Sequence, residues 1–284
     1  MDVKIHTDLQ TFADQVYPFL LRDEADNNVM LGMLHRRLAA FRNGQQLDKG
    51  EPPLFCSVID NGKVVGAASQ TPPYGLNLTR MPSTAINAVV EALAKHAVHL
   101  YGAHGPIEIS AAFATAWTAR KGVVVTRRKP LFFYKLSSPL FPKAAGGVAK
   151  IATMKDLDLL WNWERAFAEE LQLPTPDGQA EIAHKIATKT TFVWHSDTPV
   201  ATAGFRHITD TCARIIGVYV PPEQRRRGYA SAVVHAVTKH VLGLGLSNVF
   251  LFTDAGDEAP NIVYTRLGYV RVGEYADYRF GDTQ

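Results

Sequence analysis

The 284-residue sequence predicts an α/β fold with two domains of similar size. Three observations lead to this prediction. Strand-like apolar runs alternate with helix-like periodic segments along the chain. These segments follow a similar order in both halves, and a proline- and glycine-rich stretch, SSPLFPKAAGG (137–147), separates the halves. We therefore expect a first domain at 1–136, a linker at 137–147 and a second domain at 148–284.

The first half begins with two helix-like stretches, roughly 7–21 and 25–42. They precede a predicted hairpin, PLFCSVIDNGKVVGAAS (53–69), because Asn61-Gly62 is typical of a two-residue hairpin turn. The remaining expected segments are a helix around 84–100, the short piece PIEIS (106–110), a helix near 111–120, and the strand-like runs GVVVT (122–126) and LFFYKL (131–136).

The second half begins with a short predicted strand, 148–152, and a helix whose first turn Thr153 or Asp156 can cap. Its apolar residues include Leu157, Leu160, Trp161 and Ala166. A further helix is expected near 178–188. Three strand-like runs follow, TFVWHS (191–196), PVATAGFRHI (199–208) and CARIIGVYV (212–220), of which the first two are joined by a polar turn at 196–198.

The apolar period changes from Tyr229 onward, which predicts another helix. One helical face carries the apolar residues Ala230, Val233, Val234, Val237 and Val241, and the helix is expected to end near Gly243 or Gly245. The run NVFLFTD (248–254) is typical of a strand buried on both faces. EAPNIVYTRLGY (258–269) then predicts a short helix, and VRVGEYADYRF (270–280) predicts closing strand structure.

Two similar segments indicate an internal duplication. NGKVVGAAS (61–69) and SDTPVATAG (196–204) occupy equivalent places in the two halves. The halves differ before their long central helices. The first half has TPPYGLNLTRMPS (71–83) there, without the arginine–glycine cluster that the second half carries at 225–228.

Composition excludes several classes of protein. The formal net charge of +3 is small for this length, and no aromatic residue lies within the arginine run, so nucleic-acid binding is not expected. Cys56 and Cys212 lie in separate apolar runs rather than in a disulfide framework, so we expect a reducing, cytoplasmic setting. The N-terminal residues lack a signal-type apolar region and no apolar window is long enough to span a membrane, so no membrane association is expected.

The stretch YVPPEQRRRGYAS (219–231) has the features of an anion-binding loop. A helix N-terminus presents unpaired backbone N–H groups and a partial positive charge. Gly228 allows a ligand to approach the backbone closely, and arginines supply forked donors that match phosphate oxygens. A solvated basic turn is the alternative for an arbitrary arginine run. The order strand, proline, arginines, glycine and amphipathic helix favours a pyrophosphate site.

These residues resemble the acyl-CoA-binding motif of the GNAT superfamily of N-acetyltransferases. VYVPPEQRRRGYAS (218–231) matches the family's Arg/Gln-x-x-Gly-x-Gly/Ala pattern at Arg225, Gly228 and Ala230. LFTDAGDEAPNIVYTRLGYVRV (251–272) resembles the later part of the fold, with Asn261 and Tyr264 at the family's usual spacing. The resemblance covers about 148–280. It implies tandem GNAT-like domains, each with a central twisted mixed sheet flanked by helices, the first being a degenerate copy without the phosphate loop.

The resemblance also implies an acetyl-CoA-dependent N-acetyltransferase without a metal. A splay between the fourth and fifth strands would let Val218, Tyr219 and Val220 offer backbone groups to the pantetheine arm and the thioester. Tyr264 would be the general acid, and Asn261 would belong to the cofactor site. The pyrophosphate would be held by Arg225, Arg226, Arg227, Gly228, Tyr229, Ala230 and Ser231.

The general base does not follow from the sequence. The family often places a glutamate on or beside the fourth strand, but CARIIGVYV (212–220) contains no acid. Glu223, His207 and Asp254 are the candidates, and each is also explained by an ordinary structural role. Nothing near Cys212 in the sequence forms a Cys–His arrangement, so Cys212 is interpreted as a buried thiol. His96 and His99 lack a third ligand at recognisable spacing and are interpreted as surface residues.

Two functions remain open from the sequence. The first is the acetyltransferase, acting on a small-molecule or peptide amine such as a peptide N-terminus, a lysine, a polyamine, an aminoglycoside or an amino-acid analogue. The second is a non-catalytic acyl-CoA sensor, which the missing strand acid favours. Turnover with a panel of amines distinguishes them.

Overall fold

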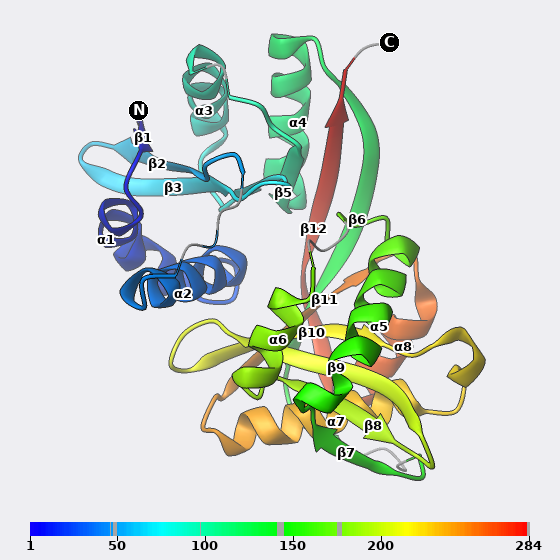
Figure 1. Ribbon diagram of the computed structural model, residues 1–284. Helices are drawn as coiled ribbons and strands as arrows, with labels where there is room; N and C mark the ends of the chain where they lie inside the picture. The colour runs from blue at the N-terminus through cyan, green and yellow to red at the C-terminus, as the bar shows by residue number, and fades with distance from the viewer. Residues whose placement is uncertain (46, 48–49, 97, 141–144, 175–177, 283–284) are drawn as a thin grey trace. The chain divides into compact units, whose positions relative to one another are not determined.

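The computed structural model describes residues 1–45, 47, 50–96, 98–140, 145–174 and 178–282 (Figure 1). Its contacts divide the chain into two units. Unit 1 comprises 1–133, 252–256 and 272–284, and unit 2 comprises 134–251 and 257–271. Among the described helices, none is long and apolar enough to cross a bilayer.

The two halves of the chain have the same order of elements, as the predicted duplication requires. Short 3₁₀ turns set aside, each half runs strand, helix, helix, three strands, helix, strand, helix, strand. The first half contains β1 (Asp2–His6), α1 (Leu9–Leu20), α2 (Asn28–Arg42), β2 (Leu54–Asp60), β3 (Lys63–Gln70), β4 (Leu76–Leu78), α3 (Ser83–Lys95), β5 (Gly102–Pro106), α4 (Ile107–Lys121) and β6 (Val124–Leu136). The second half contains β7 (Val148–Ile151), α5 (Leu157–Glu170), α6 (Ala180–Ala187), β8 (Thr191–His195), β9 (Pro199–His207), β10 (Cys212–Tyr219), α7 (Tyr229–Gly243), β11 (Asn248–Asp254), α8 (Glu258–Arg266) and β12 (Tyr269–Gly281).

Three predicted boundaries in the first half differ from the structure. Helix α4 takes in PIEIS, because Pro106 occupies the N-cap position and the helix then packs its isoleucines against the core. Helix α3 ends at Lys95 rather than near residue 100. The runs GVVVT and LFFYKL belong to one continuous strand, β6.

Unit 1 has a mixed sheet. Strands β1, β2, β3 and β4 pair antiparallel in that order, and β4 pairs parallel with β5. The later part of β12 pairs antiparallel with β5, from Tyr275 opposite Pro106 to Arg279 opposite Gly102. The last strand of the sequence therefore completes the unit that contains the first strand.

The predicted domain limits, 1–136 and 148–284, remain a prediction. They divide the sequence into two repeats, whereas the two units are groups of contacting residues and each unit contains several segments. Of the predicted linker at 137–147, residues 141–144 lie outside the described part of the chain. At its start, the backbone N–H groups of Ser137 and Leu140 donate to the carbonyls of Gly268 and Leu267 at 3.0 and 3.1 Å. A side chain at Gly268 would overlap the Ser138 carbonyl, so this close contact requires glycine.

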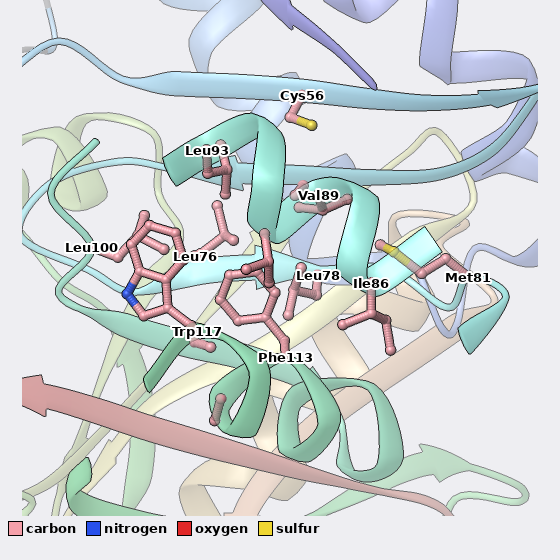
Figure 2. Packing of buried hydrophobic residues seen from close by; sticks show 14 of the residues in the cluster. Cys56, Leu76, Leu78, Met81, Ile86, Val89, Leu93, Leu100, Phe113 and Trp117 are labelled. Carbon is pink, nitrogen blue, oxygen red and sulfur yellow. The ribbon is translucent and has the colours of Figure 1, made fainter. Parts of the chain in front are cut away.

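Helices α3 and α4 pack on a hydrophobic core of unit 1 (Figure 2). Phe113 and Trp117, one helical turn apart on α4, stack with ring centroids 5.9 Å apart. They meet Leu93 of α3 and Leu76 of β4 in the same buried cluster. On the opposite side of β2, Phe55 stacks on Phe12 of α1 at 5.1 Å. The sheet is therefore covered on both faces.

Truncation of this core should destabilise the protein strongly. Phe113→Ala removes a fully buried ring, and the expected loss of unfolding free energy is about 3–5 kcal/mol. Thr115→Ala, at an exposed position of the same helix, should change it by less than about 0.5 kcal/mol. Urea unfolding followed by circular dichroism measures both. Equal midpoints for the two variants would contradict the packing described.

Unit 2 also has a mixed sheet. Strands β7, β8, β9 and β10 pair antiparallel in that order, and β10 pairs parallel with β11. Phe192 of β8 meets His240 of α7, whereas its neighbour Val193 packs with Leu160 of α5 and the apolar side of α6. Since adjacent strand residues point to opposite faces, α7 covers one face and α5 with α6 the other. The predicted mixed α/β fold class is confirmed.

The start of α5 agrees with both capping residues that the sequence suggested. The hydroxyl of Thr153 and its backbone N–H both donate to the Asp156 carboxylate, at 2.9 and 2.8 Å, in a capping box. These bonds lie in the 3₁₀ turn Met154–Asp156 that leads into the helix.

Buried tyrosines should make stability depend on alkaline pH. Burial raises the pKa of Tyr269 and of Tyr275 well above the ordinary value of about 10. Above pH ~10 the unfolded chain loses these protons while the folded chain keeps them. Each tyrosine therefore lowers the unfolding free energy by up to about 1.4 kcal/mol per pH unit there. Thermal unfolding between pH 8 and 11 tests this, and Tyr269→Phe should flatten the decline.

Candidate functional site

Strand β10 separates from its neighbour in the middle of unit 2. Its parallel pairing with β11 joins Cys212–Arg214 to Asn248–Phe250 and goes no further among the described residues. On the other side, the β9 register shifts between Ile216 and Tyr219, where Gly217 has a φ of 60°. This is a β-bulge with one extra residue. The end of β10 therefore has backbone N–H and C=O groups that can form hydrogen bonds with a ligand.

The loop after β10 leads into the first turn of α7. After the 3₁₀ turn Pro222–Gln224, Arg226 has a φ of 63° and Gly228 a φ of 83°. Gly228 is the N-cap residue of α7. A Cβ atom added at Gly228 would lie 3.7 Å from the Cβ of Ala145, an ordinary contact distance, so the positive φ rather than crowding favours glycine here. The N–H groups of Tyr229, Ala230 and Ser231 begin the helix and have no acceptor within it. Such a turn attracts anions.

The three predicted arginines have different surroundings. Arg225 donates to both carboxylate oxygens of Glu170 on α5 at 2.7 and 2.8 Å, and to the Val220 carbonyl at 2.9 Å. Arg226 and Arg227 are exposed, and Arg227 donates to Gln224 at 3.3 Å. Arg226 and Arg227 are therefore available to an anion beside the helix, whereas Arg225 connects the loop to α5.

Tyr219, the last residue of β10, is buried against α5. Its ring lies 6.2 Å from that of Trp163 and 6.3 Å from that of Phe167, and the Arg225 guanidinium lies 5.9 Å from it. Burial, followed by the charge of Glu170, raises the pKa of Tyr219. Val218 and Val220 flank it at half-buried positions. Val218 and Tyr219 thus form the bulged end of β10 and Val220 follows it, while their contact with pantetheine remains a prediction.

The predicted acid, Tyr264, lies in α8 with only 7% of its surface exposed. Its ring is 6.4 Å from that of Tyr134 and 6.1 Å from that of Tyr269. Burial, followed by the charge of Asp257, raises its pKa well above the ordinary range. Tyr264 therefore keeps its proton at every physiological pH.

Asn261 has a structural set of hydrogen bonds one turn before Tyr264. Its side-chain oxygen accepts from the Tyr134 hydroxyl at 3.0 Å, and its amide donates to the Asp257 carbonyl at 2.6 Å. Its part in a cofactor site remains a prediction.

The three candidate bases differ in exposure and partners. Glu223 is exposed in the 3₁₀ turn. Asp254 pairs with Lys129 at 3.0 Å and accepts the N–H of Gly256 at 2.8 Å, as a turn residue does. His207 is half-buried and lies against Phe205 with ring centroids 5.2 Å apart. None of the three lines the hollow between α5, α6 and strands β8–β10.

A hollow that the sequence analysis missed lies between α5, α6 and the β8–β10 part of the sheet. It is lined by residues that include Glu164, Lys185, Thr202, Gly217 and Tyr219. The Lys185 ammonium donates to both Glu164 oxygens at 3.2 Å. The sequence did carry a signal, because Glu164 falls four residues after Leu160 and three before Phe167, on the apolar stripe of α5.

Cys212 and the pair His96 and His99 were the other residues with possible chemistry in the sequence. Cys212 is a buried free thiol, as expected. His96 and His99 are exposed, as interpreted from the sequence, but α3 ends at Lys95, so the helix predicted around 84–100 includes neither of them. The His96 ring bonds to the Ala92 carbonyl at 2.8 Å. In the described part of the chain, no group of three or more His, Cys, Asp or Glu side chains is placed to hold a metal.

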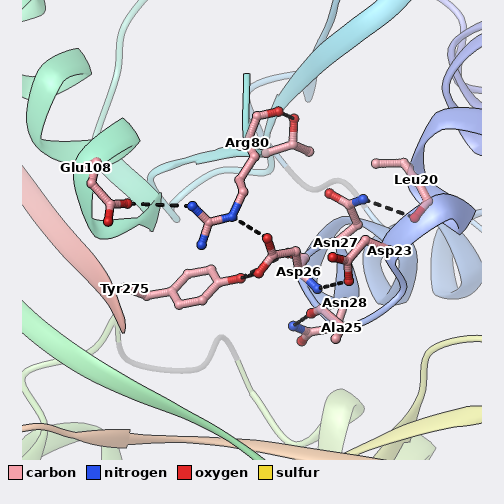
Figure 3. Close-up of polar contacts among 10 residues, drawn as sticks. Leu20, Asp23, Ala25, Asp26, Asn27, Asn28, Arg80, Glu108 and Tyr275 are labelled. Atoms are coloured by element: carbon pink, nitrogen blue, oxygen red, sulfur yellow. Dashed lines mark hydrogen bonds and ion pairs between the residues drawn. The ribbon is translucent and has the colours of Figure 1, made fainter. Parts of the chain in front are cut away.

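The corresponding place in unit 1 is occupied by its own side chains (Figure 3). Arg80, which follows β4, pairs with Asp26 and lies 3.7 Å from the Glu108 carboxylate, and the Tyr275 hydroxyl donates to Asp26 at 2.9 Å. Strands β4 and β5 remain close, since a side chain at Gly105 would meet the Leu78 carbonyl at 2.8 Å. Helix α3 begins after Pro82, without a glycine N-cap.

Comparison with known proteins agrees with this geometry. Residues 157–269 match the Acetyltransferase (GNAT) family. No curated protein sequence matches the chain significantly. Solved structures with the same fold include an acetyltransferase of the GNAT family from Colwellia psychrerythraea, at 14% identity, 99% coverage of this chain, 100% of that chain and TM-score 0.63. A GCN5-related N-acetyltransferase from Sphaerobacter thermophilus is 16% identical, with 98% of this chain and 95% of that chain covered and a TM-score of 0.64. A tandem GNAT protein from the clavulanic acid biosynthesis pathway is 14% identical, with both chains fully covered (100%) and a TM-score of 0.60.

Proposed function

Because residues 157–269 form a domain of the GNAT acetyltransferase family, we propose that the chain transfers the acetyl group of acetyl-CoA to a primary amine. The observation that carries the proposal is the path of β10. The strand parts from β11, bulges at Gly217 and continues into the glycine-capped start of α7. Thioester and pyrophosphate would thus bind to successive parts of one segment.

The donor would lie along the end of β10. Backbone groups of Val218, Tyr219 and Val220 would hold the pantetheine arm. The N–H groups that begin α7, with Arg226 and Arg227, would hold the pyrophosphate. Arg225 would act indirectly, because its guanidinium is engaged by Glu170 and the Val220 carbonyl.

The chemistry would be direct attack on the thioester. The neutral amine nitrogen bonds to the carbonyl carbon, the carbonyl oxygen becomes an oxyanion, and the C–S bond then breaks. A backbone N–H at the bulge would stabilise that oxygen. The attacking nitrogen loses one proton, and the CoA thiolate takes up one proton as it leaves. Tyr264 would supply this proton or a hydrogen bond, and its raised pKa favours the hydrogen bond.

Substitution at the phosphate loop should weaken donor binding. Gly228→Asp adds a negative charge beside the proposed pyrophosphate and a side chain at a φ of 83°. We expect the Kd for acetyl-CoA to rise at least about tenfold by calorimetry. Gly122→Asp, at a φ of 73° in the C-cap of α4, imposes similar backbone strain outside the proposed site and should leave the Kd unchanged. Unaltered affinity in Gly228→Asp would refute the pyrophosphate site.

A non-catalytic acyl-CoA sensor is the second candidate. It is favoured by the burial of Tyr264 and by the absence of an acid from β10. Such a protein would bind acetyl-CoA through the same segment without transfer. In both functions we propose a reducing cytoplasmic setting, since both cysteines are buried free thiols.

Turnover separates the two candidates. For the transferase, Tyr264→Phe should lower amine-dependent CoA release on the order of 100-fold, with the Kd for acetyl-CoA unchanged. Tyr269→Phe is the matched control, because this neighbouring buried hydroxyl is bonded to Thr238 at 2.7 Å. Wild-type protein that binds acetyl-CoA but releases no CoA with any amine would instead support the sensor.

A further inference from the structure

Glu164, which lines the hollow beside β10, is the first of a row of charged side chains. Lys185 lies 3.2 Å from Glu164 and 4.0 Å from Glu181, and Arg206 lies 3.5 Å from Glu181. Arg214 is directly opposite Arg206 in the β9–β10 pairing. The side chain of Lys185 is 14% exposed and that of Glu164 is 27% exposed. The carboxylate at the end of the row is therefore the more accessible group of its pair.

The surroundings of Glu164 are mostly apolar. Trp163 and Phe167 on α5, together with Tyr219 and Ile216 on β10, line the same hollow. Gly217, at the bulge where the thioester is proposed to lie, lines it as well. A molecule held in the hollow would thus be next to the reacting carbon.

We infer that Glu164 binds the ammonium group of the acceptor, and that the acceptor is a primary amine on an apolar body. This inference rests on the proposed acetyltransferase function. An arriving ammonium would replace Lys185 on the Glu164 carboxylate, and Lys185 would turn to Glu181, its second carboxylate. The aromatic rings would pack on the apolar body of the amine. Before attack, the bound ammonium would give its proton to the Glu164 carboxylate or to water, which leaves the neutral nitrogen beside the thioester.

The same charges disfavour other amines. Beyond Glu164 the row contains three cations, Lys185, Arg206 and Arg214. Lys185 and Arg206 share the single carboxylate of Glu181. A second ammonium, as in a polyamine, would be repelled by them. A polyhydroxylated amine would leave its hydroxyl groups without partners against the aromatic wall. A monoamine fits both constraints.

The test compares two substitutions that should have opposite effects. Glu164→Gln removes the charge that binds the ammonium, so KM for phenethylamine should rise at least about tenfold, with the Kd for acetyl-CoA unchanged. Lys185→Gln removes the competing cation, so KM should fall. Glu169→Gln, exposed on the same helix, is the control and should change neither constant. If the pair were only structural, both substitutions would raise KM together, and this result would overturn the inference.

Direct binding keeps the inference separate from the proposed function. Phenethylamine is titrated calorimetrically into each variant in the presence of CoA, which needs no turnover, and thermal unfolding shows that each variant is folded. Loss of amine binding in Glu164→Gln supports the inference even if no acetyl transfer occurs. Equal amine affinity in wild type and Glu164→Gln overturns it even if acetyl-CoA is turned over.

The class of acceptor is tested with matched amines. Phenethylamine should be preferred over 1,4-diaminobutane, which adds a cation, and over phenylalanine, which has the same ring and adds a carboxylate close to Glu164. A preference for either of these two amines over phenethylamine would overturn the assignment of an apolar monoamine.

Discussion

The parting of β10 from β11 is the constraint on which the rest of unit 2 depends. Three residue pairs join the strands, and the bulge at Gly217 then turns the end of β10 out of the regular ladder. Unpaired backbone groups in a buried strand are costly unless water or a ligand satisfies them. A ligand that binds along the end of β10 would satisfy such groups. The hollow under α5 and the start of α7 both adjoin this one segment.

The two halves show how one order of elements can keep or lose such a site. In unit 1, β4 and β5 stay in close contact, and Arg80 after β4 is satisfied by carboxylates of its own unit. In unit 2, the equivalent strand is followed by Arg226 and Gly228 at positive φ. The difference between the halves therefore lies in a short loop and a bulge rather than in the arrangement of helices and strands.

Features set by local sequence were predictable. The Asn61-Gly62 turn, the Thr153–Asp156 cap and the change of period after Gly228 each depend on neighbouring residues, and each is found. The strand order was not predictable in the same way, because the pairing of β12 with β5 joins residues about 170 positions apart in the sequence, such as Tyr275 and Pro106. The phosphate loop could be located by its motif, but the partner of Arg225 could not, since Glu170 is 55 residues away.

The Arg225–Glu170 pair connects the two parts of the candidate site. Both side chains are about two-fifths exposed, so the pair adds little to stability, on the order of 1 kcal/mol or less. Its hydrogen bonds nonetheless fix a geometry. Nη2 of Arg225 donates to both Glu170 oxygens and Nε donates to the Val220 carbonyl, so the loop before α7 is tied to the end of α5, with the guanidinium over the Tyr219 ring. Tyr219 in turn packs on Trp163 and Phe167, which line the hollow. An anion that reorganises the arginine loop would therefore act on the wall against which the acceptor is proposed to lie, so that donor and acceptor binding are expected to be energetically coupled.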